Sequence, residues 1–315
     1  MRHLIFFILL FFPFSFLSLY GQSGYTLNPE GISFQGLLFA DKLNAARREF
    51  AAQGDNAVLR SVTARALNQE GLSLLCESFP ELASLELLYS PDISDLGYLR
   101  SSGGLLELKL QGLEQIKDLQ TLPELPALQK LQLIYLPLQS LQGLSRMTRL
   151  NELDLELPAL TDFDSLAEIK RLEILKIKAE DLGDLKFLQS QRRLLRLELS
   201  SADFNNIEAL QKLTRLRILR LANTAKSKKN LSLKFLNDCR NISHLQLSNF
   251  FLQDAESLQA LTGLAYLDLG GCQGLESLEP LRNLPLLRTV KLPQGNFKPE
   301  DLGVLRKGVN IISAE

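Results

Sequence analysis

The chain has 315 residues, of which 45% are hydrophobic and 23% are charged. This balance is typical of a folded protein and excludes an intrinsically disordered one. The formal net charge is only -1 at pH 7, so we expect no nucleic-acid partner and no electrostatic attraction to an acidic membrane surface.

Residues 1–21 have the features of a secretory signal peptide. Arg2 gives a positive start, and an apolar run follows over residues 4–19. This run is marginal for crossing a hydrocarbon core of ~30 Å, and Pro13 interrupts it. We therefore expect an exported protein of the periplasm, cell envelope or extracellular space. The segment is either cleaved or retained as an N-terminal anchor, and a membrane contact is expected only if it is retained.

Residues 22–58 precede the repeats described below, and we expect them to form an N-terminal helical cap. Phe39, Leu43, Ala46 and Phe50 recur at helical spacing with charged residues between them, which predicts an amphipathic helix. A cap is needed because the first coil of a repeat array would otherwise expose its hydrophobic cross-section to water.

From residue 59 onward, the motif L-x-x-L-x-L recurs at a nearly constant interval. Ten of the eleven intervals are 22 or 23 residues, and a fixed period of this kind marks a repeat architecture. The exception is 26 residues long and contains the polar run Lys226–Asn230, which predicts a bulged loop. The coils begin at Leu59, Leu82, Leu105, Leu128, Leu150, Leu172, Leu194, Leu216, Ile242, Leu264, Leu287 and Val309.

Each coil is expected to contain one short strand and a stretch of tight turns. In Leu153–Leu155, successive side chains point to opposite faces, so the leucines face the interior and Asp154 faces outward. Apolar residues recur at every third position elsewhere in the coil, as at Leu275 and Leu278, which favours 3₁₀ turns over long helices. The predicted fold is an α/β solenoid with a parallel β-sheet on its concave face and short 3₁₀ or α turns on its convex face.

This pattern resembles the leucine-rich repeat family, in its short 22-residue class that includes the bacterial internalins. The resemblance covers roughly residues 59–314 and implies a right-handed curved solenoid. We expect the repeat domain to span residues 59–315, with about twelve coils including a C-terminal cap. Residues 66–76 are similar to the helix-bearing repeats of ribonuclease-inhibitor-type proteins. Residues 299–306 predict a second short helix at the other end, with Pro299 in its first turn.

One feature of the family is largely missing from this sequence. Family members often have asparagine at the ninth position of each coil, where its side chain bonds the backbones of neighbouring coils. Here the ninth position holds residues such as Ser90, Leu113 and Pro158, and only Cys272 and Thr224 look like ordinary substitutes. We therefore expect little of this ladder and irregular turns after the strands.

The three cysteines, Cys76, Cys239 and Cys272, lie in different coils. An odd number in an exported protein allows one disulfide and one free thiol. The simpler expectation is three small, buried hydrophobic side chains.

The sequence contains no arrangement that indicates catalysis, a metal site or a cofactor. His244 is the single histidine outside the signal-like segment, and no partner for a Ser-His-Asp device is evident. There is no zinc-type cysteine pairing, no H-E-x-x-H and no P-loop. A solvent-facing acidic stripe also lacks the desolvation that separates the pKa values of two catalytic carboxyl groups. We predict that the protein is not an enzyme.

The outward strand positions define the predicted contact surface, where an acidic coil lies beside a basic one. Such charges either compensate each other across adjacent strands or present a dipolar patch to a partner. The predicted partner-binding residues are Glu152, Asp154, Glu156, Lys176, Lys178, Arg196, Arg220, His244, Tyr266 and Asp268.

Solenoids use extended concave surfaces for binding. The sequence therefore predicts an exported, non-enzymatic module that recognises a protein partner through its concave sheet. The alternative is a glycan- or peptidoglycan-binding protein of the cell envelope. The alternative is disfavoured by the absence of tryptophan and by the scarcity of aromatic residues on the inner face, where Tyr266 is the main one.

Overall fold

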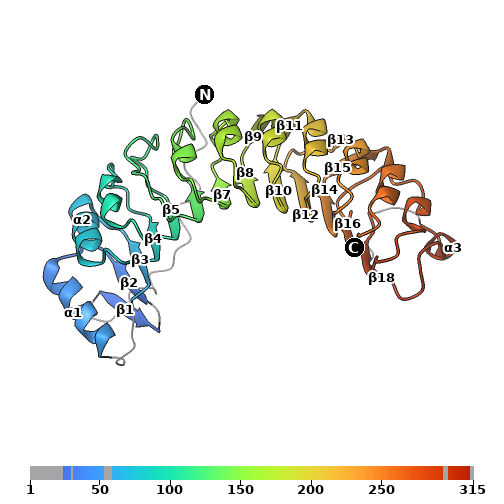
Figure 1. The fold of residues 1–315 in the computed structure, drawn as a ribbon. Coiled ribbons are helices and arrows are strands. Elements are labelled where there is room, and N and C mark those ends of the chain that lie inside the picture. The colour runs from blue at the N-terminus through green and yellow to red at the C-terminus, as the bar shows by residue number, and fades with distance from the viewer. Residues whose placement is uncertain (1–23, 30, 53–58, 294–296, 313–315) are drawn as a thin grey trace.

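The computed structural model of the chain describes residues 24–29, 31–52, 59–293 and 297–312. The signal peptide expected at residues 1–21 lies outside these ranges. The described residues form an arch, with strands along its inner edge and turns along its outer edge (Figure 1). Within these ranges, no helix is both long and apolar enough to cross a lipid bilayer.

A 14-stranded sheet lines the inner side of the arch, and its strand order follows the chain. The strands of the repeats pair in parallel and in register, which confirms the predicted sheet. These strands are β3 (Ser61–Arg65), β4 (Ser84–Leu88), β5 (Glu107–Gln111), β6 (Lys130–Ile134), β7 (Glu152–Glu156), β8 (Ile174–Lys178), β10 (Arg196–Ser201), β12 (Ile218–Asn223), β14 (His244–Ser248), β16 (Tyr266–Asp268), β17 (Thr289–Lys291) and β18 (Asn310–Ile312).

Residues of a coil are numbered here from the first leucine of its L-x-x-L-x-L motif. Positions 1, 4 and 6 point into the core, whereas positions 3, 5 and 7 face the concave surface, as the alternating burial along β7 illustrates. The core is continuous from one end of the array to the other, because each coil stacks its leucines on those of the next.

Two strands that the sequence did not predict extend the sheet at its N-terminal end. β1 (Tyr25–Asn28) and β2 (Gly31–Gln35) form an antiparallel hairpin, and β2 pairs in parallel with β3. Ile32 and Phe34 lie at positions 4 and 6 of β2 and are fully buried. The β2 segment was missed because it has isoleucine and phenylalanine in place of the leucines of the motif.

The helix expected from the spacing of apolar residues is α1 (Ala40–Ala51). It buries Leu43, Ala46 and Phe50, whereas Phe39 precedes the helix and is 59% exposed. α1 contacts β1 and β2, so the described part of the N-terminal segment is a hairpin and a helix.

Short helices make up the outer side of the arch. α2 (Gln69–Ser78) lies in the first repeat, where the ribonuclease-inhibitor resemblance implies a helix, and α3 (Pro299–Leu302) forms only part of the range predicted for it. The 3₁₀ helices are η2 (Gly97–Ser101), η3 (Leu144–Arg146), η4 (Asp164–Glu168), η5 (Leu185–Ser190), η6 (Ile207–Lys212), η7 (Lys234–Asn237), η8 (Ala255–Ala260) and η9 (Glu279–Leu281).

A second short strand follows the sheet strand in several coils of the C-terminal half. β9 (Asp181–Asp184) pairs in parallel with β11 (Asp203–Asn205), and β13 (Lys229–Ser232) pairs with β15 (Phe250–Gln253). These pairs replace the irregular turns that the sequence predicted after the main strands.

The last coil begins one residue earlier than predicted. Asn310 pairs with Thr289 at position 3, so position 1 is Gly308 and not Val309. Gly308 has φ of +92°, a left-handed conformation that glycine adopts without strain, and this allows the chain to turn into β18 sooner.

Backbone hydrogen bonds link neighbouring coils at the end of the strands, where asparagine side chains often do so in leucine-rich repeats. In the coils of β2 to β6, the residue at position 8 has positive φ and donates its N–H to the position 7 carbonyl of the next coil, at 2.7–3.2 Å. This conformation costs a residue other than glycine about 1–2 kcal/mol. The residues are Gly36, Ala66, Tyr89, Gly112 and Tyr135.

Two side chains at position 9 also bond to backbone. Ser90 Oγ accepts from the Leu67 N–H at 3.0 Å, so the expectation that Ser90 would not act as a ladder residue was wrong. Cys272 Sγ lies 3.3 Å from the Leu247 carbonyl, as expected of a substitute, but Thr224 is exposed and does not take this role.

The cysteines are free and buried, which confirms their packing role. Burial raises the pKa of the Cys76 and Cys272 thiols to about 11 and that of Cys239 to about 12.

Core stacking leads to a first prediction. Leu153 is fully buried between Leu131 and Leu175 of the neighbouring strands. Leu153→Ala should lower the free energy of unfolding by about 2–5 kcal/mol, because it leaves a cavity that neighbouring coils cannot fill. Urea denaturation monitored by circular dichroism measures this. Lys109→Ala, on the concave side of the same sheet, should stay within about 0.5 kcal/mol of wild type, and equal losses in both variants would contradict the assigned register.

Candidate functional site

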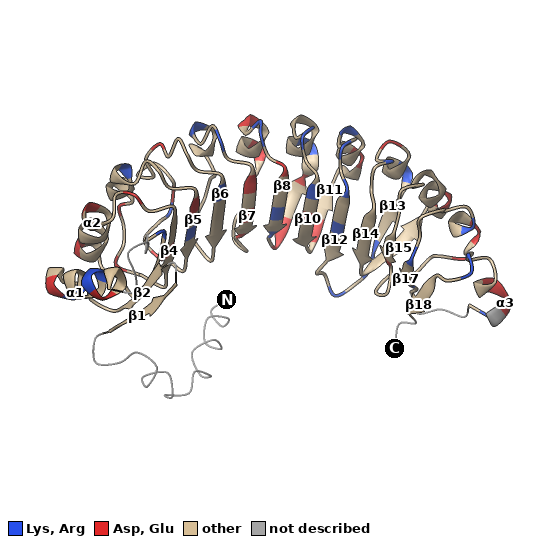
Figure 2. Cartoon of the chain, turned by 60° about the horizontal axis from the view of Figure 1, so that its bottom comes forward, with Lys and Arg blue, Asp and Glu red and all other residues tan. Residues whose placement is uncertain are grey.

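The predicted contact residues all lie on the large sheet, at positions 3, 5 or 7, and form a band from β7 to β16. Figure 2 shows acidic and basic residues alternating across the strands of this band. Asp268 differs from the others because it is only 8% exposed and accepts a hydrogen bond from the Gly270 N–H at 2.9 Å. Asp268 thus lies at position 5 of β16, but its carboxylate bonds to the turn that follows and is less accessible than the rest of the band.

The acidic strand β7 is paired with bases on both sides. Lys176 of β8 binds the central residue, Asp154, and Lys130 of β6 binds the first residue, Glu152. Each pair is partly exposed, so its stabilising contribution is small. The pairs are Glu152–Lys130 at 3.5 Å, Asp154–Lys176 at 3.6 Å, and Glu156–Lys178.

The same compensation extends along position 5, the middle of each strand. The order acid, base, glutamine, acid, base occurs twice in ten successive coils. Because strands lie about 4.8 Å apart, opposite charges become lateral neighbours. Of the two interpretations of the charge pattern, cross-strand compensation therefore describes the ion pairs at position 5, Asp154–Lys176 and Arg220–Glu198, the latter at 3.0 Å. The row is Glu86, Lys109, Gln132, Asp154, Lys176, Glu198, Arg220, Gln246, Asp268 and Lys291.

The Glu156 carboxylate accepts hydrogen bonds from two side chains, as does that of Glu198, which Arg196 and Arg220 bind. Tyr135 donates its hydroxyl proton to Glu156 Oε1 at 2.6 Å, and Lys178 donates to the same oxygen. Burial alone would raise the pKa of Glu156, but the hydrogen bonds from Lys178 and Tyr135 outweigh it and hold that pKa below its usual value. The hydrogen bond to Glu156 raises the pKa of Lys178.

A depression of about 310 Å³ opens on the concave face over β8, β10, β12 and β14. It exists because position 7 changes from large to small side chains along the array. Glu156 and Lys178 occupy this position on β7 and β8, whereas the next three strands have Ser200, Ala222 and Ser248. We call this depression the hollow. The predicted residues that line it are Asp154, Glu156, Lys176, Lys178 and Arg220.

A smaller depression of about 190 Å³ lies beside the hollow, between Arg220, His244 and Tyr266. The rings of His244 and Tyr266 are stacked, with centroids 6.0 Å apart and an angle of 24° between planes. Over the described part of the chain, no three histidine, cysteine or acidic side chains are grouped to hold a metal ion.

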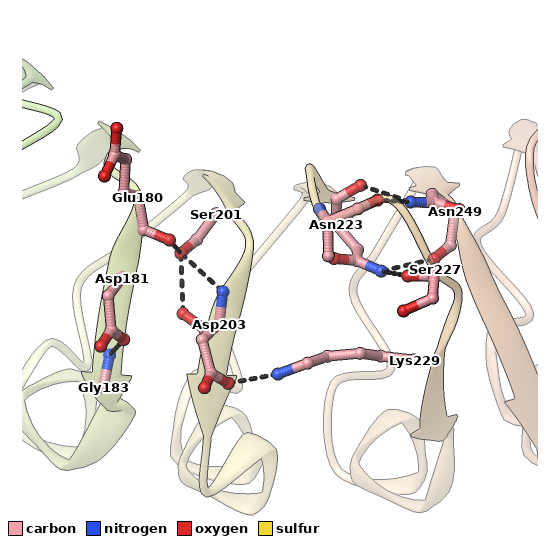
Figure 3. A network of polar contacts seen from close by, with 10 residues as sticks. Glu180, Asp181, Gly183, Ser201, Asp203, Asn223, Ser227, Lys229 and Asn249 are labelled. Carbon is pink, nitrogen blue, oxygen red and sulfur yellow. Dashed lines mark hydrogen bonds and ion pairs between the residues drawn. The ribbon is translucent and has the colours of Figure 1, made fainter. Parts of the chain in front are cut away.

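The structure adds one element that sequence reasoning missed, a reciprocal pair of asparagines at position 8. Asn223 Nδ2 donates to the carbonyls of Ser227 and Asn249, both at 2.9 Å. Asn249 Nδ2 donates in return to the carbonyls of Asn223 at 3.0 Å and Ala225 at 2.7 Å. These bonds fix the inserted loop of the long coil against the next coil (Figure 3).

The fixed loop lies immediately beyond the small residues at the edge of the hollow. Lys226 and Lys228 on this loop are exposed, while Lys229 is paired with Asp203 of β11 (Figure 3). The sequence does carry a signal for this pair, but it lies at position 8 of the coil and not at the ninth position, where asparagine is common in leucine-rich repeats. Position 8 is polar in three successive coils, with Ser201, Asn223 and Asn249.

Solved structures show where this architecture occurs. The internalin InlF of Listeria monocytogenes matches with a TM-score of 0.57 and 24% identity, over 76% of this chain and 68% of that chain. The leucine-rich-repeat ectodomain of the receptor kinase GASSHO1/SCHENGEN3 of Arabidopsis thaliana, in complex with CASPARIAN STRIP INTEGRITY FACTOR 2, matches with a TM-score of 0.58 and 17% identity, over 86% and 33%.

These folds share the stacked parallel strands and the short turns described above. The chain has the leucine-rich-repeat fold. Another structure with this solenoid, TLR13 in complex with ssRNA13, has a TM-score of 0.53 and 16% identity, over 89% of this chain and 50% of that one. No protein-family model and no curated protein matches the leucine-rich-repeat chain.

The asparagine pair leads to a second prediction. Asn223→Ala leaves the carbonyls of Ser227 and Asn249 without an amide donor, which should lower the free energy of unfolding by about 1–3 kcal/mol. Limited trypsin digestion followed by mass spectrometry should show faster cleavage after Lys226 and Lys228.

The matched control for this experiment is Asn241→Ala. Asn241 is exposed and donates to the Thr214 carbonyl at 2.7 Å outside the loop, so its loss should leave both measurements unchanged. Identical cleavage rates in wild type and the Asn223 variant would show that the pair does not hold the loop.

The Glu156 cluster leads to a third prediction. Because the pKa of Glu156 in the fold lies below its unfolded value of about 4.3, its ionised form stabilises the fold above that pH. This contribution is lost as the pH falls through the folded pKa. Tyr135→Phe removes one hydrogen bond and should raise the pKa of Glu156, as measured by NMR titration of its carboxyl carbon. Tyr98→Phe, on the convex side, should leave this pKa unchanged, and no increase in the Tyr135 variant would contradict the assignment.

Proposed function

We propose that this protein is an exported, non-enzymatic binding module that recognises a protein partner through its concave sheet. Residues 1–21 serve as the signal peptide, residues 22–58 as the N-terminal cap, and residues 59–315 as the repeat domain. The observation that supports this most is the hollow, because it is lined by the charged band on one side and by small side chains on its floor.

The hollow has the physical properties of a protein contact. Ser200, Ala222 and Ser248 leave room for a side chain of the partner, and Arg220 offers donors beside them. The alternating charges give little net attraction but a detailed pattern, and electrostatic complementarity of this kind sets specificity and encounter rate more than affinity. A stacked parallel sheet holds the pattern rigidly over many coils.

Comparisons support a macromolecular partner. The GASSHO1/SCHENGEN3 ectodomain was solved with a bound factor, and TLR13 with an RNA. For this chain the net charge of -1 and the paired lysines of the band favour a protein over an RNA, which requires an excess of positive charge.

The described side chains also favour binding over catalysis. The cysteine thiols are buried and have raised pKa values, so they are poor nucleophiles. His244 is exposed and stacks on Tyr266, with its Nδ1 3.0 Å from the Ser243 hydroxyl. The three carboxylates of β7 are bound to lysines rather than held in a water-excluding pocket.

A fourth prediction tests the concave contact without breaking an ion pair. A photo-crosslinking amino acid at Ser200, Ala222 or Ser248 should link the same protein in cells that express the full chain, as identified by mass spectrometry. The same group at Glu168, which is exposed on the convex η4, should not link that protein.

Two outcomes would contradict the proposal. One is crosslinking of the same protein from Glu168 with equal yield, which would place the contact on the convex side. The other is the absence of any crosslinked protein at all three positions together with retention of the chain on peptidoglycan, which would favour the glycan-binding alternative.

A further inference from the structure

Two tyrosines stand on the edge of the sheet outside the hollow, at the carboxyl ends of β4 and β6. Tyr89 and Tyr135 occupy position 8 of their coils and are 49% and 50% exposed. Gly112 occupies the same position in the coil between them. The tyrosines are therefore two coils apart on one edge, with an open glycine between their attachment points. We call these three residues the tyrosine edge.

Both hydroxyl groups bond to a side chain of the next strand, and the Tyr89 ring also contacts the preceding one. Tyr89 Oη accepts a hydrogen bond from Gln111 Nε2 at 2.6 Å, and the Arg65 guanidinium lies 5.4 Å from the ring centroid. Tyr135 donates its hydroxyl proton to Glu156 at 2.6 Å. Little side-chain entropy is then lost when a ligand packs on the rings, and such preorganisation favours binding.

Gly112 is fitted to this arrangement. A Cβ at residue 112 would lie 2.8 Å from Cδ1 of Tyr89, so a larger residue would displace the ring. The Tyr89 ring thus leans over the backbone of the glycine.

The backbone at both tyrosines is strained. They have φ of +48° and +53°, where Gly36 and Gly112 occupy the equivalent positions of other coils without penalty. Exposed bulky residues in this conformation cost stability that glycine would not, and residues of this kind concentrate at binding sites. The backbone alone would therefore favour glycine over tyrosine at these two positions.

We propose that the tyrosine edge binds a proline-rich segment in the polyproline II conformation. Two strand spacings separate the tyrosines by about 9.6 Å along the array. One turn of a polyproline II helix contains three residues and advances about 9.3 Å. Prolines at positions i and i+3 of a segment that crosses the ends of β4 to β7 can therefore pack on one ring each.

The hydrogen-bonding groups suit the same ligand. A polyproline II segment has no internal hydrogen bonds, so its carbonyls need donors. Tyr89 accepts from Gln111, which leaves its own hydroxyl proton available, and Arg65 adds further donors beside it. Aromatic grooves with a few donors are a recurrent way to bind such segments.

A glycan fits these residues less well. Sugar hydroxyls require several polar side chains, including acceptors, around an aromatic ring. Glu156 beside Tyr135 already binds both Tyr135 and Lys178, and Gln111 already donates to Tyr89.

This inference concerns a second surface and does not depend on the hollow. The hollow is lined by residues of β7 to β14, and neither tyrosine is among them. The tyrosine edge can therefore fail its test while crosslinking from Ala222 succeeds, and the reverse also holds.

A fifth prediction tests the tyrosine edge with an acetylated, amidated proline decamer as the probe. Because the chain has no tryptophan, its six tyrosines dominate the fluorescence, and comparison with the double variant below isolates the part that comes from Tyr89 and Tyr135. Calorimetry gives the dissociation constant. The decamer should bind, and a glycine-serine decamer should bind at least tenfold more weakly. The double variant Tyr89→Gly, Tyr135→Gly should weaken binding of the proline decamer at least tenfold.

The double variant also separates binding from folding. Glycine removes the cost of the left-handed backbone at both positions, which offsets the lost side-chain hydrogen bonds. The thermal unfolding midpoint of the double variant should therefore stay close to that of wild type. Tyr98→Ala, which removes an exposed tyrosine of η2, should leave proline binding unchanged. No binding of the proline decamer, equal binding of both decamers, or binding of chitohexaose that depends on Tyr89 and Tyr135 would overturn the proposal.

Discussion

Lateral stacking of incomplete coils is the constraint on which the rest of this structure depends. A coil cannot bury its own leucines, so it is stable only when Leu131, Leu153 and Leu175, and their equivalents along the array, lie side by side. Register follows from this contact, because a shift of one residue would turn every inward leucine outward. The in-register strands then place positions 3, 5 and 7 of successive coils in straight rows on the concave face. Side chains that are neighbours on this surface therefore come from the same position of successive coils, about 22 residues apart in the sequence.

Two of these rows determine what the concave face can do. At position 5, acidic and basic residues alternate, so neighbours such as Asp154 and Lys176 form ion pairs. The concave face therefore has alternating charges but only a weak net electrostatic field. Position 7 changes from charged to small residues between Lys178 and Ser200, which opens the hollow. The same geometry that aligns the leucines thus produces both the compensated band and the space beside it. At position 8, the left-handed turn of the N-terminal coils positions Tyr89 and Tyr135, whereas asparagines in the long coil hold a basic loop.

The regular part of this structure was predictable because it depends on spacing alone. The L-x-x-L-x-L period located eleven of the twelve repeat strands in the correct register, and alternation within each strand placed Glu152 and Tyr266 on the concave face. Prediction failed where a local conformation replaced the motif. Ile32 and Phe34 carry no leucine signal, and Gly308 shifts β18 by one residue. The hollow and the tyrosine edge depend on which residues occupy positions 7 and 8 of neighbouring coils. These positions can be compared only once the register of the strands is known.

The central claim is that a protein partner is recognised through the concave rows around the hollow. A crystal structure of this chain bound to the protein that crosslinks to Ala222 tests it most directly. The account predicts a side chain of the partner inside the hollow, in contact with Ser200 or Ser248, and polar contacts to Arg220 or the Glu156–Lys178 pair. A complex in which the partner covers the convex 3₁₀ helices and leaves the hollow open to solvent would contradict it.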